Sequence, residues 1–196
     1  MTNRQKQAMK TRNKIYNAAI KLMQKKGIEQ TTIEDICKRA NVSIGSFYNY
    51  FKSKDEVLYS INLSADEYFK GTVTPELEGL PADEKIIHFF RQYARYNKDT
   101  GLDFTKHLYF NSENKYFLDH NRYMHILMKG ILEEELTNKR FNPELSLEQL
   151  EDLFFLVARG IVSDWCLHDG DYDLEEKTVF YFELLLHEEG NLFLKR

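Results

Sequence analysis

The chain has few of the residues that interrupt helices: 3 prolines and 9 glycines among 196 residues. This scarcity disfavours a β-sandwich or barrel and favours helices. No apolar run approaches the roughly 18 residues that cross a bilayer, so we expect no membrane partner. Hydrophobic residues make up 42% of the chain, enough for a sizeable core. These features predict an all-α globular protein, and the apolar patterns described below indicate about nine helices.

Cysteine is also scarce, because Cys37 and Cys166 are the only two. Two are too few for a disulfide framework or a thiolate cluster, and we expect both to be reduced and buried in a cytoplasmic protein. The basic N-terminus lacks the apolar stretch of a secretory signal. The chain shows no phosphate-binding loop, nucleophile elbow or paired-carboxylate motif. The sequence therefore predicts no cofactor and no enzymatic activity.

The histidines lack the spacing of a helical metal site. His107, His120, His125 and His168 form no H-x-x-x-H pattern. With Asp119 or Asp169 close by, they could be interpreted as an acid–base site, but structural or surface histidines are the commoner interpretation. The sequence predicts no metal site.

Charge is distributed unevenly along the chain. Residues 1–54 carry twelve Lys/Arg and three Asp/Glu, which gives 12 − 3 = +9, whereas residues 55–196 carry fifteen and twenty-eight, which gives 15 − 28 = −13. The sum returns the net charge of −4. A basic end on an acidic body is typical of a nucleic-acid-binding segment, although a solvated basic helix face has the same charge.

Three apolar patterns in the basic segment predict a helix-turn-helix. One stripe at helical spacing comprises Ile15, Ala18, Ala19, Leu22 and Met23, and Gly27 follows it as a C-cap. A second helix follows, with two possible capping boxes: Thr31 with Glu34, or Thr32 with Asp35. Its stripe comprises Ile33, Ile36, Cys37 and Ala40. Ser43 can cap a third, short helix over residues 44–51, which would enter the major groove of DNA.

The segment "TTIEDICKRANVSIGSFYNYFKSKDEVL" closely resembles the DNA-binding domain of TetR-family transcriptional regulators. The positions in register with the family pattern are Thr31, Thr32, Ile36, Ala40, Val42, Ser43, Gly45, Tyr48, Tyr50, Phe51, Lys54 and Leu58. The firm match covers about residues 10–60. Beyond it, the resemblance extends only to length and helical layout.

The resemblance implies a homodimer that binds a near-palindromic DNA operator and is released from it by a small-molecule effector. It implies a DNA-binding domain over 1–54 and a helical effector-binding and dimerisation domain over 55–196, with the four-helix dimer interface built from the last two helices. The implied DNA contacts are Thr32, Ser43, Ile44, Gly45, Ser46, Tyr48, Asn49, Tyr50 and Lys54.

Each aromatic of the third helix has two interpretations. Phe47 and Phe51 lie four residues apart, so we expect them to pack inward. Tyr48 and Tyr50 could be core residues, but the resemblance favours phosphate contacts. Ile44 departs from many relatives, which have Lys there, and it could touch only a thymine methyl.

The acidic body reads as further helices separated by turn-rich segments. We expect a connecting helix that ends near Gly71, then helices over about 82–98, 102–110 and 114–140, and two more over 146–170 and 171–190. The middle helices are rich in aromatic residues and Met, which suit either plain core or a ligand pocket. The predicted pocket residues are Tyr93, Phe110, Tyr123, Met128 and Trp165.

Two alternatives to a regulator remain open. The helix-turn-helix could scaffold a protein contact in a non-catalytic ligand-binding or interaction module, but such a scaffold does not need a charge of +9. An enzyme on a helical domain is the other alternative, and the missing motifs disfavour it.

Overall fold

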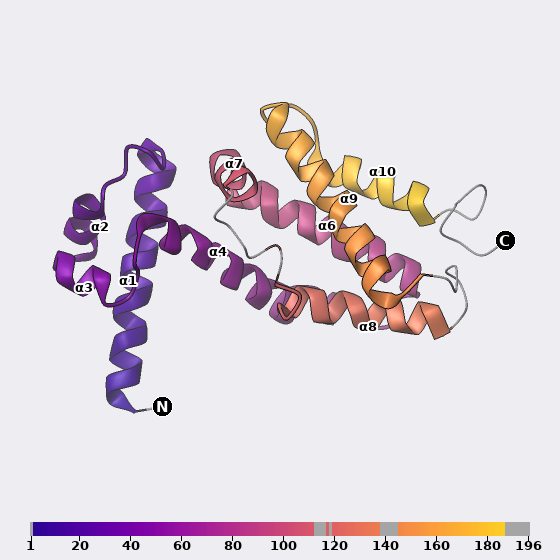
Figure 1. Cartoon of the computed structure of the whole chain (residues 1–196), viewed down its shortest axis with the longest axis horizontal. Helices are drawn as coiled ribbons and strands as arrows, with labels where there is room; N and C mark the ends of the chain where they lie inside the picture. The colour runs from indigo at the N-terminus through magenta and orange to yellow at the C-terminus, as the bar shows by residue number, and fades with distance from the viewer. Residues whose placement is uncertain (1, 112–116, 118, 138–144, 187–196) are drawn as a thin grey trace. The chain divides into compact units, whose positions relative to one another are not determined.

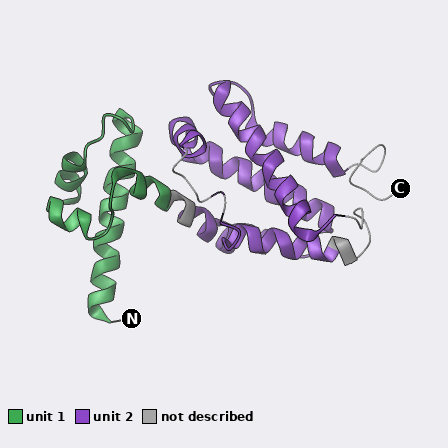
Figure 2. Ribbon diagram, in the orientation of Figure 1, with its two compact units in different colours: residues 1–63 green, residues 64–196 purple. Residues whose placement is uncertain are grey.

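The computed structural model describes residues 2–111, 117, 119–137 and 145–186, without the side chains of 61–63 and 135–137. Within these ranges the chain is helical and has no strand, so the predicted all-α fold is confirmed (Figure 1). The chain divides into two compact units, Met1–Leu63 and Ser64–Arg196 (Figure 2). None of the described helices has the length and apolar character needed to cross a membrane.

Unit 1 packs three helices around one small core. They are α1 (Asn3–Lys26), α2 (Ile33–Ala40) and α3 (Ile44–Tyr48). Gly27 ends α1 at φ 86°, where a side chain would be strained, as its place after the apolar stripe predicts. The core residues include Ile15, Ala19, Met23, Ile36, Phe47 and Phe51.

The connecting helix continues further than the sequence predicts. Helix α4 (Lys54–Tyr68) is followed without a loop by the π-helix η1 (Phe69–Val73) and the short α5 (Thr74–Glu76). The prediction that it ends near Gly71 is therefore wrong. Pro75 lies at the start of α5, where its missing N–H costs nothing, and the Thr74 hydroxyl donates to the Phe69 carbonyl at 3.0 Å.

Unit 2 is built from the end of α4 and five longer helices. They are α6 (Ala82–Thr100), α7 (Leu102–Phe110), α8 (Tyr123–Thr137), α9 (Leu147–Leu167) and α10 (Leu174–Leu186). Helix α8 begins later than the predicted 114, and most of 112–118 lies outside the described residues. Stacked rings join α6 to α10, since Phe90 and Phe182 lie 4.1 Å apart between centroids.

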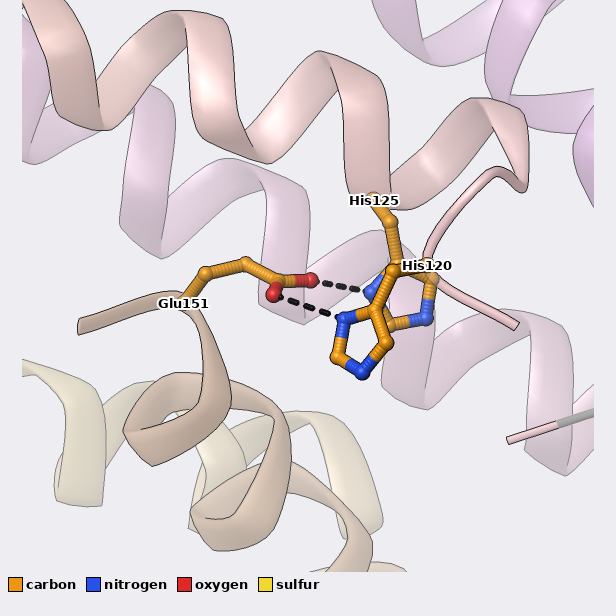
Figure 3. A group of neighbouring side chains, drawn as sticks. All are labelled: His120, His125 and Glu151. Atoms are coloured by element: carbon orange, nitrogen blue, oxygen red, sulfur yellow. Dashed lines mark hydrogen bonds and ion pairs between the residues drawn. The ribbon is translucent and has the colours of Figure 1, made fainter. Parts of the chain in front are cut away.

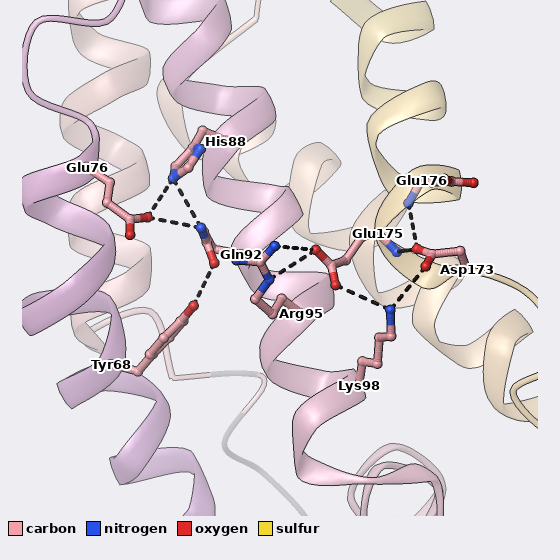
Figure 4. A network of polar contacts seen from close by, with 9 residues as sticks. All are labelled: Tyr68, Glu76, His88, Gln92, Arg95, Lys98, Asp173, Glu175 and Glu176. Carbon is pink, nitrogen blue, oxygen red and sulfur yellow. Dashed lines mark hydrogen bonds and ion pairs between the residues drawn. The ribbon is translucent and has the colours of Figure 1, made fainter.

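Two groups of polar contacts lie along α6 in unit 2 (Figure 4). Tyr68 donates to Gln92 Oε1 at 2.6 Å, and Gln92 Nε2 donates to Glu76 at 3.0 Å. Further along α6, Arg95 pairs with Glu175 at 2.9 Å. These contacts tie the end of α4 and α5 to α6, and α6 to α10.

Both cysteines are buried and free, as predicted. Burial raises the pKa of the Cys166 thiol to about 11 and also raises the pKa of Cys37. A thiol with a raised pKa carries little thiolate near pH 7, so neither residue is poised for redox chemistry.

Candidate nucleic-acid interface and effector region

The start of α2 settles the choice between the two possible capping boxes. The Thr32 hydroxyl accepts from the Asp35 N–H at 3.1 Å, and Asp35 accepts from the Thr32 N–H at 3.2 Å. Thr31 is instead buried, and its hydroxyl donates to the Gly27 carbonyl at 2.8 Å. Thr32 is exposed as the N-cap of α2, where the resemblance implies a DNA contact.

An ion pair holds this end of α2 against the end of α1. Lys26 Nζ donates to Asp35 Oδ2, and this bond, together with the Thr32 contacts, lowers the pKa of Asp35 to about 2. The pair leaves Asp35 ionised and compensated at neutral pH, so its negative charge is offset next to the basic surface.

Helix α3 has two opposite faces. Phe47 is 0% exposed and Phe51 1% exposed, so the prediction that both pack inward is confirmed. Ile44 is 46% exposed and Tyr48 54% exposed on the outer side. The Ser43 hydroxyl caps the helix by accepting from the Ser46 N–H at 3.1 Å. A large apolar and an aromatic side chain thus stand exposed beside small polar residues.

The remaining residues of this stretch vary in exposure. Asn49 is exposed at the end of α3, whereas Ser46 and Tyr50 are half-buried. Gly45 is exposed, and a Cβ built on it meets no atom within 4 Å. The space beside Gly45 is therefore open, which permits close approach of a second molecule.

Two basic side chains are committed to internal contacts. Lys54 Nζ donates to the Ile28 carbonyl at 2.7 Å, which attaches the start of α4 to the turn after α1. The Arg12 guanidinium lies 4.8 Å from the centroid of the Phe51 ring, and it donates to Ser60 Oγ at 3.0 Å. Lys54 keeps two further ammonium donors, so the internal bond is compatible with a contact to phosphate.

The predicted pocket residues do not converge on one cavity. Met128 is 0% exposed in the core, and Trp165 is 6% exposed and donates to the Tyr172 carbonyl at 3.2 Å. Phe110 is 54% exposed at the end of α7. The set remains a prediction, and in this conformation its members are spread over separate parts of unit 2.

Tyr93 has a polar partner inside unit 2 that the sequence pattern did not reveal. Its hydroxyl lies 2.6 Å from that of Tyr109, and burial raises the pKa of both phenols. The pair places hydrogen-bonding groups among the aromatic rings of α6 and α7. Such groups could orient a ligand, although the periodicity of the aromatics carries no sign of them.

Tyr123 borders a shallow groove of about 420 Å³ on unit 2. Its hydroxyl lies 2.9 Å from Thr74 Oγ1. The other lining residues include Leu77, Lys85, Ile126, Leu127 and Ile131. Among the predicted pocket residues Tyr123 is the one that lines this groove.

Large apolar side chains are exposed on the last two helices. On α9 these are Leu156 and Leu167, and on α10 they are Phe180, Tyr181 and Leu184. Their exposed fractions lie between 40% and 72%. Exposed apolar side chains of this kind are typical of a surface that another molecule covers.

Comparison with known proteins shows that the chain is similar to bacterial transcriptional regulators. The sequence model described as bacterial regulatory proteins, tetR family, matches residues 15–61. The chain is 28% identical over 196 residues to the probable acrEF/envCD operon repressor of Escherichia coli (strain K12), which covers 88% of this chain and 83% of that protein. It is 25% identical over 179 residues to the fatty acid metabolism regulator protein of Bacillus subtilis (strain 168). That match covers 88% of this chain and 92% of the other protein.

The fold has solved counterparts over nearly its whole length. The structure of Thermus thermophilus FadR, a transcriptional repressor in complex with lauroyl-CoA, matches with a TM-score of 0.69 at 25% identity. The match covers 89% of this chain and 92% of that one. Both the N-terminal helices and the larger helical unit therefore have counterparts in one known architecture.

Proposed function

We propose that the outer face of α3, with Thr32, Tyr50 and Lys54, is the DNA-contacting surface of this chain, which belongs to the TetR family of transcriptional regulators. The protein is a ligand-responsive DNA-binding repressor and not an enzyme. The proposed contacts are Thr32, Ser43, Ile44, Gly45, Ser46, Tyr48, Asn49, Tyr50 and Lys54.

One observation carries this proposal: α3 buries Phe47 while it leaves Ile44 and Tyr48 about half exposed. A helix that packs only for stability has no need to expose two large side chains next to the open space at Gly45. In a groove, the Ile44 side chain can contact a thymine methyl, and the Tyr48 hydroxyl can donate to a phosphate. The +9 charge of residues 1–54 supplies the attraction to the DNA backbone.

Members of this family act as dimers, and we propose that α9 and α10 form the interface. The exposed Leu156, Phe180 and Leu184 would be buried in a four-helix arrangement. The change Leu184→Glu should give a monomeric mass in light scattering at micromolar concentration. Lys70→Glu, at an exposed position outside α9 and α10, serves as the charge control and should leave the dimer intact. A dimer that persists in Leu184→Glu and in Phe180→Glu would contradict this interface.

For the effector we propose a fatty acyl-coenzyme A as the first class to test. The support is the relative from Thermus thermophilus, whose structure holds lauroyl-CoA. The aromatic and methionine interior of unit 2 is chemically suited to an acyl chain, and Tyr93 and Tyr109 provide polar groups within it. We also propose that DNA binding is confined to residues 1–54, the first part of the compact unit Met1–Leu63, with effector binding and dimerisation in 55–196. A cytoplasmic location is proposed as well, because a DNA-binding regulator requires access to the chromosome.

Selection of bound fragments from random double-stranded DNA tests the DNA-binding surface. We expect an enriched near-palindrome, followed by nanomolar binding in fluorescence anisotropy. Tyr48→Phe removes one hydroxyl and should weaken binding to all sequences, whereas Ile44→Ala should relax preference at one base position. If no palindrome is enriched, or if both variants bind as the wild type does, the proposed surface is wrong.

A further inference from the structure

Three side chains from separate segments of unit 2 converge around one buried carboxylate (Figure 3). Glu151 lies on α9 and is 0% exposed, while His125 lies in the first turn of α8 and is 2% exposed. His120 lies in the turn before α8, with 45% of its side chain exposed. His120 Nδ1 is 3.0 Å from Glu151 Oε2, and His125 Nδ1 contacts Oε1 of the same carboxylate.

We propose that His120, His125 and Glu151 bind a divalent first-row transition-metal ion, for which Zn²⁺ is the best match. Two imidazole nitrogens and a carboxylate form a three-ligand zinc set that leaves a fourth position for water or another ligand. The donor atoms already lie within 4.8 Å of one another. No proposed DNA or effector contact is among them, so this site is independent of the proposed function.

The distances between the three ligand side chains are already close to those of a tetrahedral zinc site. In a tetrahedral site with bonds of about 2.0–2.1 Å, neighbouring ligand atoms stand about 3.3 Å apart. The 3.0 Å between His120 Nδ1 and Glu151 Oε2 is close to that value. Small outward movements of the three side chains would therefore admit the ion.

The surroundings hold two of the ligands in place. The His125 ring stacks on Phe155 at 4.1 Å between centroids, which limits its rotation. His120 Nε2 lies 3.9 Å from Asp152 Oδ1 on the outer side. A carboxylate at the far nitrogen of a ligating histidine is the usual means of orienting it.

Protons can be redistributed without any other reactant. In a neutral imidazole whose Nδ1–H donates to Glu151, the proton moves to Nε2 when the metal takes Nδ1. For His120, Asp152 is the acceptor near that nitrogen.

The charges around the group favour a cation. Glu151 supplies a buried negative charge that an ion would compensate. Arg122, which lies between the two histidines in the sequence, is buried, and its Nε donates to Asp66 at 3.2 Å, so that carboxylate offsets its charge. The exposed His120 gives the ion a path from solvent.

The competing explanation is an arrangement held by protons alone, in which both histidines donate to Glu151 and no metal binds. Titration of Zn²⁺ into chelator-stripped full-length protein at pH 7, in competition with a chromophoric zinc chelator, distinguishes the two. We expect one tightly bound Zn²⁺ per chain and a rise in Tm on binding. A Co²⁺-loaded sample should lack a thiolate charge-transfer band, because no cysteine is a ligand.

Variants locate the site. His120→Ala removes an exposed ligand and should weaken Zn²⁺ binding more than about 100-fold, and Glu151→Gln should do the same with little change in shape. Asp152→Asn should weaken it about 10-fold. The matched control is His88→Ala, which breaks another His–Glu pair at 2.8 Å and should leave binding unchanged.

Two results would overturn the proposal. One is the absence of stoichiometric Zn²⁺ binding by the folded wild-type protein, which would leave the proton-held arrangement. The other is binding that survives in both His120→Ala and Glu151→Gln, when circular dichroism shows both variants to be folded. Neither result depends on DNA binding, so failure here is separate from failure of the proposed function.

Discussion

Lys54→Met separates two roles of one side chain, an internal bond that the structure shows and a phosphate contact that we propose. Lys54 Nζ donates to the Ile28 carbonyl at 2.7 Å, and the same ammonium group is a proposed phosphate contact. Methionine keeps most of the length of the side chain and removes its charge and its donors. The internal bond and the phosphate contact can then be measured by different assays.

The internal bond predicts a loss of stability. A hydrogen bond from a charged donor contributes about 1.5–3 kcal/mol, and the part-buried Ile28 carbonyl would lose its partner. We expect denaturant unfolding of Lys54→Met to show a loss near the lower end of that range, because solvent can reach the group. Circular dichroism in urea is the measurement.

The phosphate contact predicts a change in salt dependence. Each lost contact reduces the slope of log K against log[salt] by about 0.9, which is about a 3.5-fold smaller fall in affinity between 50 and 200 mM salt. Lys70→Met, an exposed lysine in unit 2, is the matched control and should leave the slope unchanged. If Lys54→Met loses stability but keeps the wild-type slope of log K against log[salt], Lys54 only stabilises unit 1 through its bond to Ile28 and does not contact DNA.

Three further predictions concern unit 1. Phe47→Ala should cost about 3–5 kcal/mol in urea unfolding, because the ring is 0% exposed; a loss below 1 kcal/mol would contradict its place in the core. Gly45→Ala should fold normally, since its Cβ meets nothing, yet weaken DNA binding in anisotropy by blocking close approach; unchanged affinity would show that DNA does not approach there. In the folded protein the pKa of the Asp35 carboxyl is lowered from its ordinary value of 3.8 to about 2, so its contribution to stability is present above about pH 4 and is lost as pH falls towards 2. Asp35→Asn should therefore flatten that part of the curve of unfolding free energy against pH. A curve identical to that of the wild type would refute the Lys26–Asp35 pair as the cause.

Local patterns in unit 1 predict the structure well, because its short helices are set by neighbours in sequence. The four-residue spacing of Phe47 and Phe51 is enough to bury both. The choice of cap is different, because Thr31 and Thr32 both have an acidic residue three positions on. Two bonds to the end of α1 distinguish the residues: the Thr31 hydroxyl donates to the Gly27 carbonyl, and Lys26 donates to the Asp35 carboxylate.

At the end of α4, helix-breaking residues predict a stop earlier than the structure shows. Gly71 and Pro75 each indicate a stop, yet the chain passes through η1 and α5 as far as Glu76. The wider π-helical turn lets the Thr74 hydroxyl bond to the Phe69 carbonyl, so Pro75 begins a new turn. Helix propensities of single residues cannot predict this change from α-helical to π-helical hydrogen bonding.

Aromatic periodicity predicts which face of a helix is apolar but not what covers it. Tyr93 and Phe110 come from similar patterns, yet Tyr93 is 5% exposed and Phe110 is 54% exposed. The difference depends on how α6 and α7 pack against the rest of unit 2. A pocket and a filled core also share the same stripe, so the pocket prediction could not be sharpened from sequence.

The histidines mark the limit of spacing rules most clearly. Such rules detect ligands within one helix, where positions four apart share a face. His120 and His125 are five apart, on a turn and a helix, and Glu151 follows on α9. They meet only because α8 packs against α9, which brings a buried carboxylate to two imidazoles. A buried carboxylate must be compensated by protons or by a cation, and spacing along the chain cannot indicate which; the number of Zn²⁺ ions bound per chain can.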